Sequence, residues 1–246
     1  MGKRASLLTL IVLLAAAGAQ AQMPEAELSF NQGLLHLREG RLEMAVSEFK
    51  KAIEKDKRNP YFQKALGLAY VQQRKYDDAI ACFTRALEFN PFYIDVRNDL
   101  GTALILQGKR EEGKREYILA FGEATNPTPE LSARNLGQAY FDEQNFAEAL
   151  KWYQTAVKRN AKYADAHLGL ADSLLALNRG EEAVVQLESA SNHVPDNNDI
   201  LVALGDAYFK VGRFTEARAK LEHVAKRDPT GPAGRRAADM LRNLPR

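Results

Sequence analysis

The sequence has a single cysteine, Cys82, among its 246 residues, which excludes both a disulfide framework and a metal cluster held by cysteines. The 9 prolines and 16 glycines are near average usage, so collagen-like repeats are excluded as well. Hydrophobic residues make up 46% of the chain and charged residues 27%, which is typical of folded proteins. Neither charge is in large excess, because the chain has 34 basic and 32 acidic residues. The composition therefore gives no electrostatic argument for nucleic-acid binding.

The N-terminal residues have the pattern of a secretory signal peptide. Two basic residues precede a run of apolar and small residues, 7–17, and the small-residue stretch 18–21 follows. We expect cleavage between Ala21 and Gln22. The alternative is a retained membrane anchor, but the 11 residues of that run would cover only about half of a bilayer core of roughly 30 Å.

The expected export signal differs from that of a lipoprotein. A lipoprotein needs a cysteine after the small-residue stretch, and residues 16–19 read Ala-Ala-Gly-Ala. No later apolar stretch approaches 18 residues, so we expect a periplasmic protein with a free N-terminus and no membrane insertion. Loss of Lys3 and Arg4 leaves 34 − 2 = 32 basic residues against 32 acidic ones, and this neutral chain favours a protein partner.

One pattern recurs six times in the remaining sequence, at an offset of 34 residues and once of 36. Each unit has a small residue, at Gly33, Gly67, Gly101, Gly137, Ala171 and Gly205. Twelve positions later comes a second small residue, at Ala45, Ala79, Gly113, Ala149, Ala183 and Ala217. A large apolar residue follows after four more, at Phe49, Phe83, Tyr117, Tyr153, Leu187 and Leu221. Prolines near three unit ends, Pro91, Pro195 and Pro229, are compatible with helix termination.

With these series the chain resembles the tetratricopeptide repeat (TPR) family over residues 26–231. The six repeats are then 26–59, 60–93, 94–127, 130–163, 164–197 and 198–231. Apolar residues three and four apart form two runs in each unit, which predicts two amphipathic helices joined by a tight turn. A single unit cannot bury both of its apolar faces, so the units must stack. The resemblance implies an all-α, right-handed superhelical solenoid.

The C-terminal residues predict a capping helix over about 232–244. Ala233, Ala237, Met240 and Leu241 lie on one helical face, while the opposite face is polar. A terminal repeat needs such a polar outer surface. The sequence therefore predicts thirteen helices and no strand, with residues 22–246 forming one TPR domain.

The third repeat is irregular. It has Gly113 where the other repeats have alanine, and the two extra residues fall in a stretch that contains Pro127 and Pro129. Because proline disfavours helix at the residue before it, we expect a longer and stiffer connection to the fourth repeat. The insertion either bends the array or is a neutral extension of a surface loop.

The sequence has no recognisable catalytic or metal-binding motif. The four histidines, His36, His167, His193 and His223, are widely separated, and none belongs to a zinc motif. Cys82 lies one residue before the large apolar Phe83, where a buried small residue is the simpler interpretation. Trp152 has no assigned role. We therefore expect a protein that is not an enzyme and that needs no cofactor or metal.

The TPR resemblance implies that the second, fifth, ninth, twelfth and thirteenth residues of each repeat face a concave groove. In the first two repeats these positions include the apolar residues Phe30, Leu34, Leu37, Tyr61, Leu68 and Val71. Phe30, Leu34 and Leu68 stand where the family often has polar residues, so we predict that they anchor a partner segment. Residues 23–27 of the same chain are an alternative cover for this patch.

In repeats four to six the charged residues at these positions are mostly acidic. They include Asp142, Asp165, Asp172, Asp199 and Asp206, with Arg134 and Lys210 as the basic members. This pattern predicts a second, acidic part of the groove, suited to a basic segment of the partner.

Two groups within the TPR family bear on function. Chaperone-binding members hold a C-terminal carboxylate with lysine and asparagine at the fifth and ninth positions of the first repeat, where this chain has Phe30 and Leu34. The chain more closely resembles the exported six-repeat proteins of type IV pilus biogenesis and stability, which are pilotins for outer-membrane secretins. The similarity rests on the export signal, the six repeats and the stretch 128–137. The lipid-bearing cysteine of that family is absent.

Three functional interpretations follow. The first is a periplasmic adaptor for a secretin or pilus assembly complex. The second is a general envelope scaffold for another machine, such as polysaccharide export or outer-membrane assembly, and fold alone does not separate the two. The third is an enzyme, which the absence of a catalytic cluster disfavours.

Overall fold

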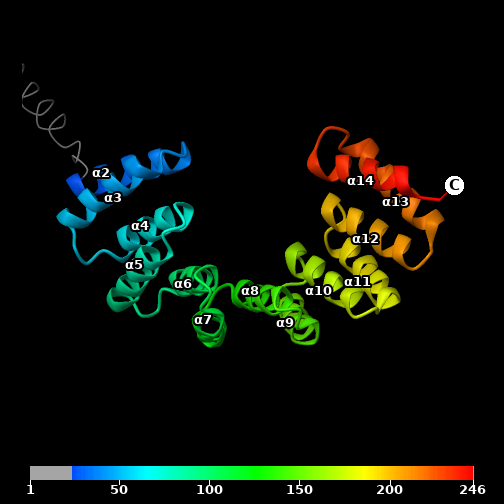
Figure 1. Ribbon diagram of the computed structural model, residues 1–246, viewed down its shortest axis with the longest axis horizontal. Coiled ribbons are helices and arrows are strands. Elements are labelled where there is room, and N and C mark those ends of the chain that lie inside the picture. Colours follow the sequence, from blue (N-terminus) through cyan, green and yellow to red (C-terminus); the bar gives the residue numbers. More distant parts are fainter. Residues whose placement is uncertain (1–23, 246) are drawn as a thin grey trace, which may run out of the picture. The chain divides into compact units, whose positions relative to one another are not determined.

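The computed structural model describes residues 24–245. The predicted signal peptide and its cleavage site lie outside these residues. Within them the chain forms thirteen α-helices and no strand, which confirms the predicted all-α fold (Figure 1). None of these thirteen helices is both long and apolar enough to cross a membrane.

The helices form six pairs followed by a single terminal helix. Their bounds are α2 (Glu25–Arg38), α3 (Leu42–Lys55), α4 (Pro60–Gln72), α5 (Tyr76–Phe89), α6 (Ile94–Leu106), α7 (Arg110–Gly122), α8 (Pro129–Asp142), α9 (Phe146–Arg159), α10 (Ala164–Ala176), α11 (Gly180–His193), α12 (Asn198–Lys210), α13 (Phe214–Arg227) and α14 (Pro232–Asn243). In each pair the even-numbered helix packs against the odd-numbered helix that follows it.

The chain divides between Pro91 and Phe92 into two compact units. Unit 1 contains α2 to α5, and unit 2 contains α6 to α14. Within unit 2, α8 contacts α10, α10 contacts α12, and α12 contacts α14, so these helices form a row (Figure 1). We call the face of unit 2 formed by α6 and this row the inner face. The other helices of unit 2, α7, α9, α11 and α13, pack behind it.

Close approach of paired helices explains the first series of small residues. A Cβ atom added at Gly33 would lie 2.5 Å from the ring of Phe49, sixteen positions later, and one added at Gly67 would lie 2.5 Å from Phe83. The same conflict would arise between Gly205 and Leu221, at 2.7 Å. The large residue of each of these repeats therefore occupies the space that the small residue leaves empty.

The turn between the two helices of each repeat contains one residue with left-handed backbone geometry. These residues are Gly40, Arg74, Gly108, Gln144, Asn178 and Gly212, with φ between 58° and 94°. Glycine tolerates this conformation without steric cost, and asparagine tolerates it better than other residues with a side chain. Arg74 and Gln144 bear the steric cost of this conformation.

The irregular connection after the third repeat is a longer loop. Six residues, 123–128, separate α7 from α8, whereas four residues separate α3 from α4, α5 from α6, α9 from α10, α11 from α12, and α13 from α14. Asn126 stiffens the loop, because its Nδ2 donates to the carbonyl of Ala120 at 2.7 Å and its Oδ1 accepts from the N–H of Thr128 at 2.8 Å. Pro129 then begins α8, where a missing N–H costs nothing.

Helix α14 packs on α13 and α12. It buries Ala233 and Ala237, and Leu244 just after it is also buried. Its opposite face carries exposed arginines, among them Arg236, which pairs with Asp199 of α12. This is the arrangement expected of a capping helix.

Candidate functional site

The apolar residues predicted to anchor a partner lie on α2 and α4 of unit 1. Leu34 is 39% exposed and Tyr61 is 59% exposed. Leu37, Leu68 and Val71 are half-buried. Phe30 is also half-buried, and its ring lies 4.9 Å from that of Phe62 and 5.7 Å from that of Phe49, measured between centroids.

The exposure of these residues divides the predicted anchors into packing residues and surface residues. Phe30 contributes to the packing of α2 against α3 and α4, so its removal would cost stability as well as contact area. Leu34 and Tyr61 present side chains to solvent and are the better candidates for direct contact in unit 1.

The inner face of unit 2 contains a hollow of about 200 Å³ between α6 and α8. We call it the α6–α8 hollow. Its lining comes from α6, α7 and α8, namely Thr102, Ile105, Leu106, Tyr117, Arg134, Asn135, Gln138, Ala139 and Asp142. Leu106 is 48% exposed at its edge.

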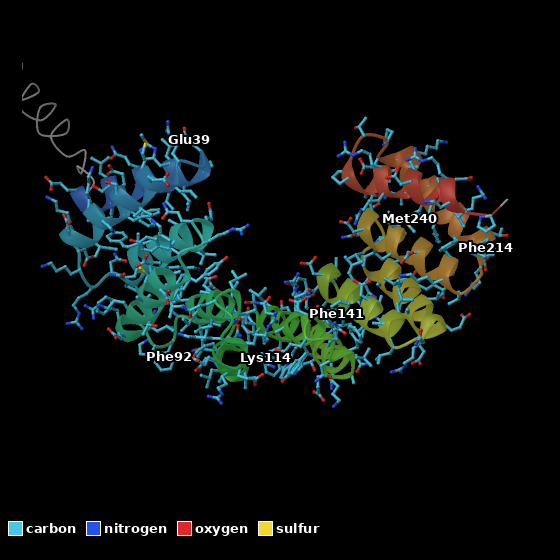
Figure 2. The ribbon with its side chains drawn as sticks, in the orientation of Figure 1. Glu39, Phe92, Lys114, Phe141, Phe214 and Met240 are labelled. Atoms are coloured by element: carbon cyan, nitrogen blue, oxygen red, sulfur yellow. The ribbon has the colours of Figure 1, made fainter. Side chains whose placement is uncertain are left out.

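A second hollow, of about 160 Å³, lies between α8 and α10, and we call it the α8–α10 hollow. It is lined by Arg134, Gln138, Phe141, Tyr153, Asp165, Leu168, Gly169 and Asp172. Phe141, labelled in Figure 2, lies near the end of α8, and its ring also meets Phe146 edge-on at 5.1 Å. The two hollows share Arg134 and Gln138, which therefore form a ridge between them.

Buried tyrosines from the outer helices form the floors of both hollows. The hydroxyl of Tyr117 lies 2.9 Å from Oγ1 of Thr102, and that of Tyr153 donates to Oε1 of Gln138 at 3.0 Å. Burial raises the pKa of both phenols, so both stay protonated near neutral pH. The other four repeats have Phe49, Phe83, Leu187 and Leu221 at this position. Only the third and fourth repeats therefore have, at this position, a tyrosine whose hydroxyl is fixed by a hydrogen bond.

The ridge is polar and already ordered. Gln138 accepts from Tyr153 and donates from Nε2 to Oδ1 of Asp142 at 2.8 Å. Arg134 lies one helical turn earlier, with Nη2 3.9 Å from Oδ2 of Asp165. Because the amide of Gln138 is held by both Tyr153 and Asp142, this part of the surface needs little reorganisation when a partner binds.

The predicted acidic residues have different partners. Asp199 pairs with Arg236, and Asp206 pairs with Lys210 at 2.7 Å. Asp172 is exposed on the inner face, at the rim of the α8–α10 hollow. Burial of its surroundings raises its pKa, Lys210 opposes this rise, and Asp206 adds to it.

Two further hollows lie in unit 2. One of about 130 Å³ is lined by Asp206, Phe209, Leu221, Met240, Asn243 and Leu244, at the contact of α12 and α13 with the capping helix. A more open one of about 760 Å³ lies beside the turn from α10 to α11, where Arg179 already holds Glu182 through two hydrogen bonds of 2.7 and 2.6 Å. We take the inner face as the candidate site, because two hollows adjoin there and combine apolar and charged walls.

Neither the cysteine nor the buried histidine lines these two hollows. Burial raises the pKa of the Cys82 thiol to about 12, so it is not a nucleophile near neutral pH. His167 is buried, with Nε2 2.9 Å from the carbonyl of Ala161 and Nδ1 accepting from Gln186 at 2.8 Å. Among residues 24–245, no group of three or more His, Cys, Asp or Glu side chains could hold a metal ion.

Several residues of the inner face were not predicted from the sequence. The repeat register places Leu168, Phe141 and Gln138 at its fifth, twelfth and ninth positions, so the same rule would have found them. Only the charged residues at these positions of repeats four to six were selected. Tyr153 and Gly169 had no such signal, because their role depends on contact between two neighbouring repeats.

Comparison with known proteins agrees with the fold. The tetratricopeptide repeat family matches residues 26–59, 60–93, 140–197 and 181–241. A curated relative, the CTR9 homolog of Arabidopsis thaliana, is 26% identical over 208 residues; the match covers 80% of this chain and 19% of the relative. The chain thus spans about a fifth of that relative's length.

Two solved structures share the arrangement of helices. The crystal structure of PilW, described as a widely conserved type IV pilus biogenesis factor, has a TM-score of 0.69 at 17% identity and covers 85% of this chain and 96% of its own. The PilF protein of Pseudomonas aeruginosa has a TM-score of 0.66 at 18% identity, with coverages of 88% and 97%. At these identities the similarity demonstrates the fold alone. Together with the family matches, it shows that this chain belongs to the tetratricopeptide repeat proteins.

Proposed function

We propose that this chain is a non-enzymatic scaffold of the cell envelope that binds a segment of a partner protein along its inner helices. TPR proteins mediate protein–protein interactions, and the scaffold role is the simplest use of this fold. The observation that carries the proposal is the pair of adjoining hollows on the inner face of unit 2. Packed side chains form these hollows in the unbound chain, so few side chains of this protein need to become ordered when the partner binds.

The preferred context is assembly of a type IV pilus or its secretin. The similarity of fold to PilW, and the signal-like N-terminal sequence, support this choice. The lack of a lipid-bearing cysteine favours the second candidate, a periplasmic adaptor for another envelope machine such as polysaccharide export or outer-membrane assembly. Both candidates place the protein in the periplasm after cleavage between Ala21 and Gln22.

Export is tested first. Cell fractionation and intact-mass measurement of the native protein should give a periplasmic chain that begins at Gln22. A mature form that retains Lys3, or one that is extracted only with detergent, would contradict the export proposal.

The partner is tested by capture from envelope extracts of the native host, followed by mass spectrometry. Recovery of a secretin or pilus-assembly protein supports the first candidate, and recovery of a polysaccharide exporter or outer-membrane assembly protein supports the second. Leu106→Asp places an unpaired carboxylate at the edge of the α6–α8 hollow, and Leu34→Asp does the same in unit 1. Each variant should lower recovery if its unit contributes to the contact.

The matched control is Val185→Asp, which changes a 65% exposed apolar residue of the outer helix α11 in the same way. All three variants should melt within a few degrees of the wild type, because the changed side chains are exposed. Equal recovery by wild type, Leu106→Asp and Leu34→Asp would show that neither surface binds the partner. A collapse in melting temperature for Leu34→Asp would show that Leu34 belongs to the core.

A further inference from the structure

Asp172 differs from the other acidic residues near the α8–α10 hollow. Asp142 accepts a hydrogen bond from Gln138, Asp165 faces Arg134, and Asp206 pairs with Lys210. Among residues 24–245, Asp172 has no hydrogen bond or ion pair of its own. Its carboxylate therefore stands at the rim of the hollow with its hydrogen-bonding capacity available.

The local charges favour a cation at this point. Burial by the surrounding walls has the largest effect and raises the pKa of Asp172; the attraction of Lys210 lowers it in part, and Asp206 raises it by a smaller amount. The carboxylate has thus lost part of its hydration, and the attraction of Lys210 compensates for that loss only in part. An incoming cation would supply the interaction that solvent supplies incompletely.

Part of the wall of this hollow is apolar. Phe141 and Leu168 line the hollow, the ring of Tyr153 forms its floor, and Gly169 contributes only backbone. A lysine or arginine side chain has the matching shape, because an aliphatic stem of three or four methylenes ends in a charged head.

Resting on the scaffold function proposed above, we propose that the α8–α10 hollow receives a lysine or arginine side chain of an extended partner segment. The stem lies on Phe141 and Leu168, and the charged head pairs with Asp172. A carboxylate in the same place would meet Asp165 and Asp172, and Arg134, the only basic residue in the lining, is already directed at Asp165.

The neighbouring hollow extends the predicted motif. The α6–α8 hollow presents Ile105 and Leu106 and suits an apolar side chain. Packed helices are about 8–10 Å apart. An extended segment of polyproline-II type rises about 3.1 Å per residue with three residues per turn, so two side chains three positions apart lie on the same side at about 9 Å. The expected partner segment therefore carries an apolar residue and a basic residue in that relation.

The test is selection of random dodecapeptides displayed on phage against the purified chain, followed by fluorescence anisotropy with the selected peptide. We expect enrichment of lysine or arginine three positions from an apolar residue, and depletion of aspartate and glutamate. Asp172→Asn should weaken binding of the selected peptide about tenfold, and raised salt should weaken the wild-type complex more than the variant complex. Asp172→Lys should invert the preference, so that a peptide with glutamate in place of the basic residue binds better.

The control is Glu112→Gln, which removes a carboxylate from the exposed first turn of the outer helix α7. It should change affinity by less than twofold. Because Asp172 and Glu112 are both exposed, neither substitution should unfold the protein.

The outcomes separate the two proposals. Selected peptides with acidic or uncharged consensus sequences, whose binding is lost in Leu106→Asp but unchanged in Asp172→Asn, would overturn the basic-residue proposal and leave the scaffold function intact. Peptides whose binding is unaffected by both substitutions would remove the inner face of unit 2 as the binding site, and the scaffold proposal for that face with it.

Discussion

The contact between Tyr153 and Gly169 allows a quantitative test of how the fourth and fifth repeats pack. A Cβ atom added at Gly169 would lie 2.3 Å from two carbons of the Tyr153 ring, where ordinary contacts are 3.4–4 Å. The ring cannot retreat, because a Cβ atom at Gly137 on its other side would already be 2.9 Å away. Its hydroxyl is also fixed by Gln138. Gly169→Ala therefore overpacks a site with no free space.

The expected size of this effect follows from two opposing contributions. Overpacking costs about 1–3 kcal/mol, and this contact should be near the upper end of that range. Alanine gains roughly 1 kcal/mol over glycine inside a helix. Gly169→Ala should thus lower the free energy of unfolding by about 2 kcal/mol. Gly122→Ala is the control, because no atom lies within 4 Å of the added Cβ, and it should leave stability unchanged or raise it.

Urea unfolding followed by far-ultraviolet circular dichroism measures both variants. A second substitution tests the cause, because Tyr153→Leu combined with Gly169→Ala recreates the pair Leu187 and Ala203 found at the equivalent positions one repeat later. The double variant should be more stable than the sum of the single effects by about 1 kcal/mol or more. Strict additivity, or a Gly169→Ala variant as stable as Gly122→Ala, would refute the packing argument.

Three further substitutions have expected outcomes. Gln144→Gly should raise the urea midpoint, because a left-handed φ of 59° costs a residue with a Cβ atom about 1–2 kcal/mol, and an unchanged or lower midpoint would contradict this. Ser132→Ala should raise the melting temperature, because it removes a fully buried hydroxyl that has no hydrogen-bond partner in the described part of the chain, and a buried unsatisfied group costs about 1–3 kcal/mol. Burial, with a smaller contribution from His193, lowers the pKa of His167 below 6.5, so the unfolded chain binds the proton more tightly. Stability should therefore be complete above pH 6.5 and fall as the pH drops below it, and His167→Gln should flatten this dependence in urea titrations at several pH values.

The fold could be predicted because its determinants are local and repeated. Glycine at position 33 and phenylalanine at position 49 recur as a pair with one spacing, and the ring of Phe49 does occupy the space left by Gly33. If one repeat departs from this pattern, the other five still show it, so the repeat can be recognised. The two extra residues before Pro129 could be placed in a loop for the same reason, since the repeat pattern continues on both sides of them.

The binding surface was harder to predict because it depends on contacts between units. Phe30 occupies a groove position by its register, yet its ring packs between Phe49 and Phe62. The acidic residues were found from the register too. The register does not show which of these carboxylates has an ion-pair partner, because that depends on where long basic side chains reach. Lys210 pairs with Asp206, whereas Asp172 has no ion pair with any described residue.

The position of each residue within a hollow determines what its substitution can reveal. Tyr117 and Tyr153 form the floors and belong to the core, so changing them alters stability and binding together. Leu106 and Asp172 lie at the edges, where their side chains are exposed and little packing is lost. Binding measured with edge variants therefore reports on recognition, and unfolding measured with floor variants reports on the stacking of the repeats. A floor variant that kept full stability but lost binding would contradict this separation, because it would mean that the tyrosines do not support the helices around them.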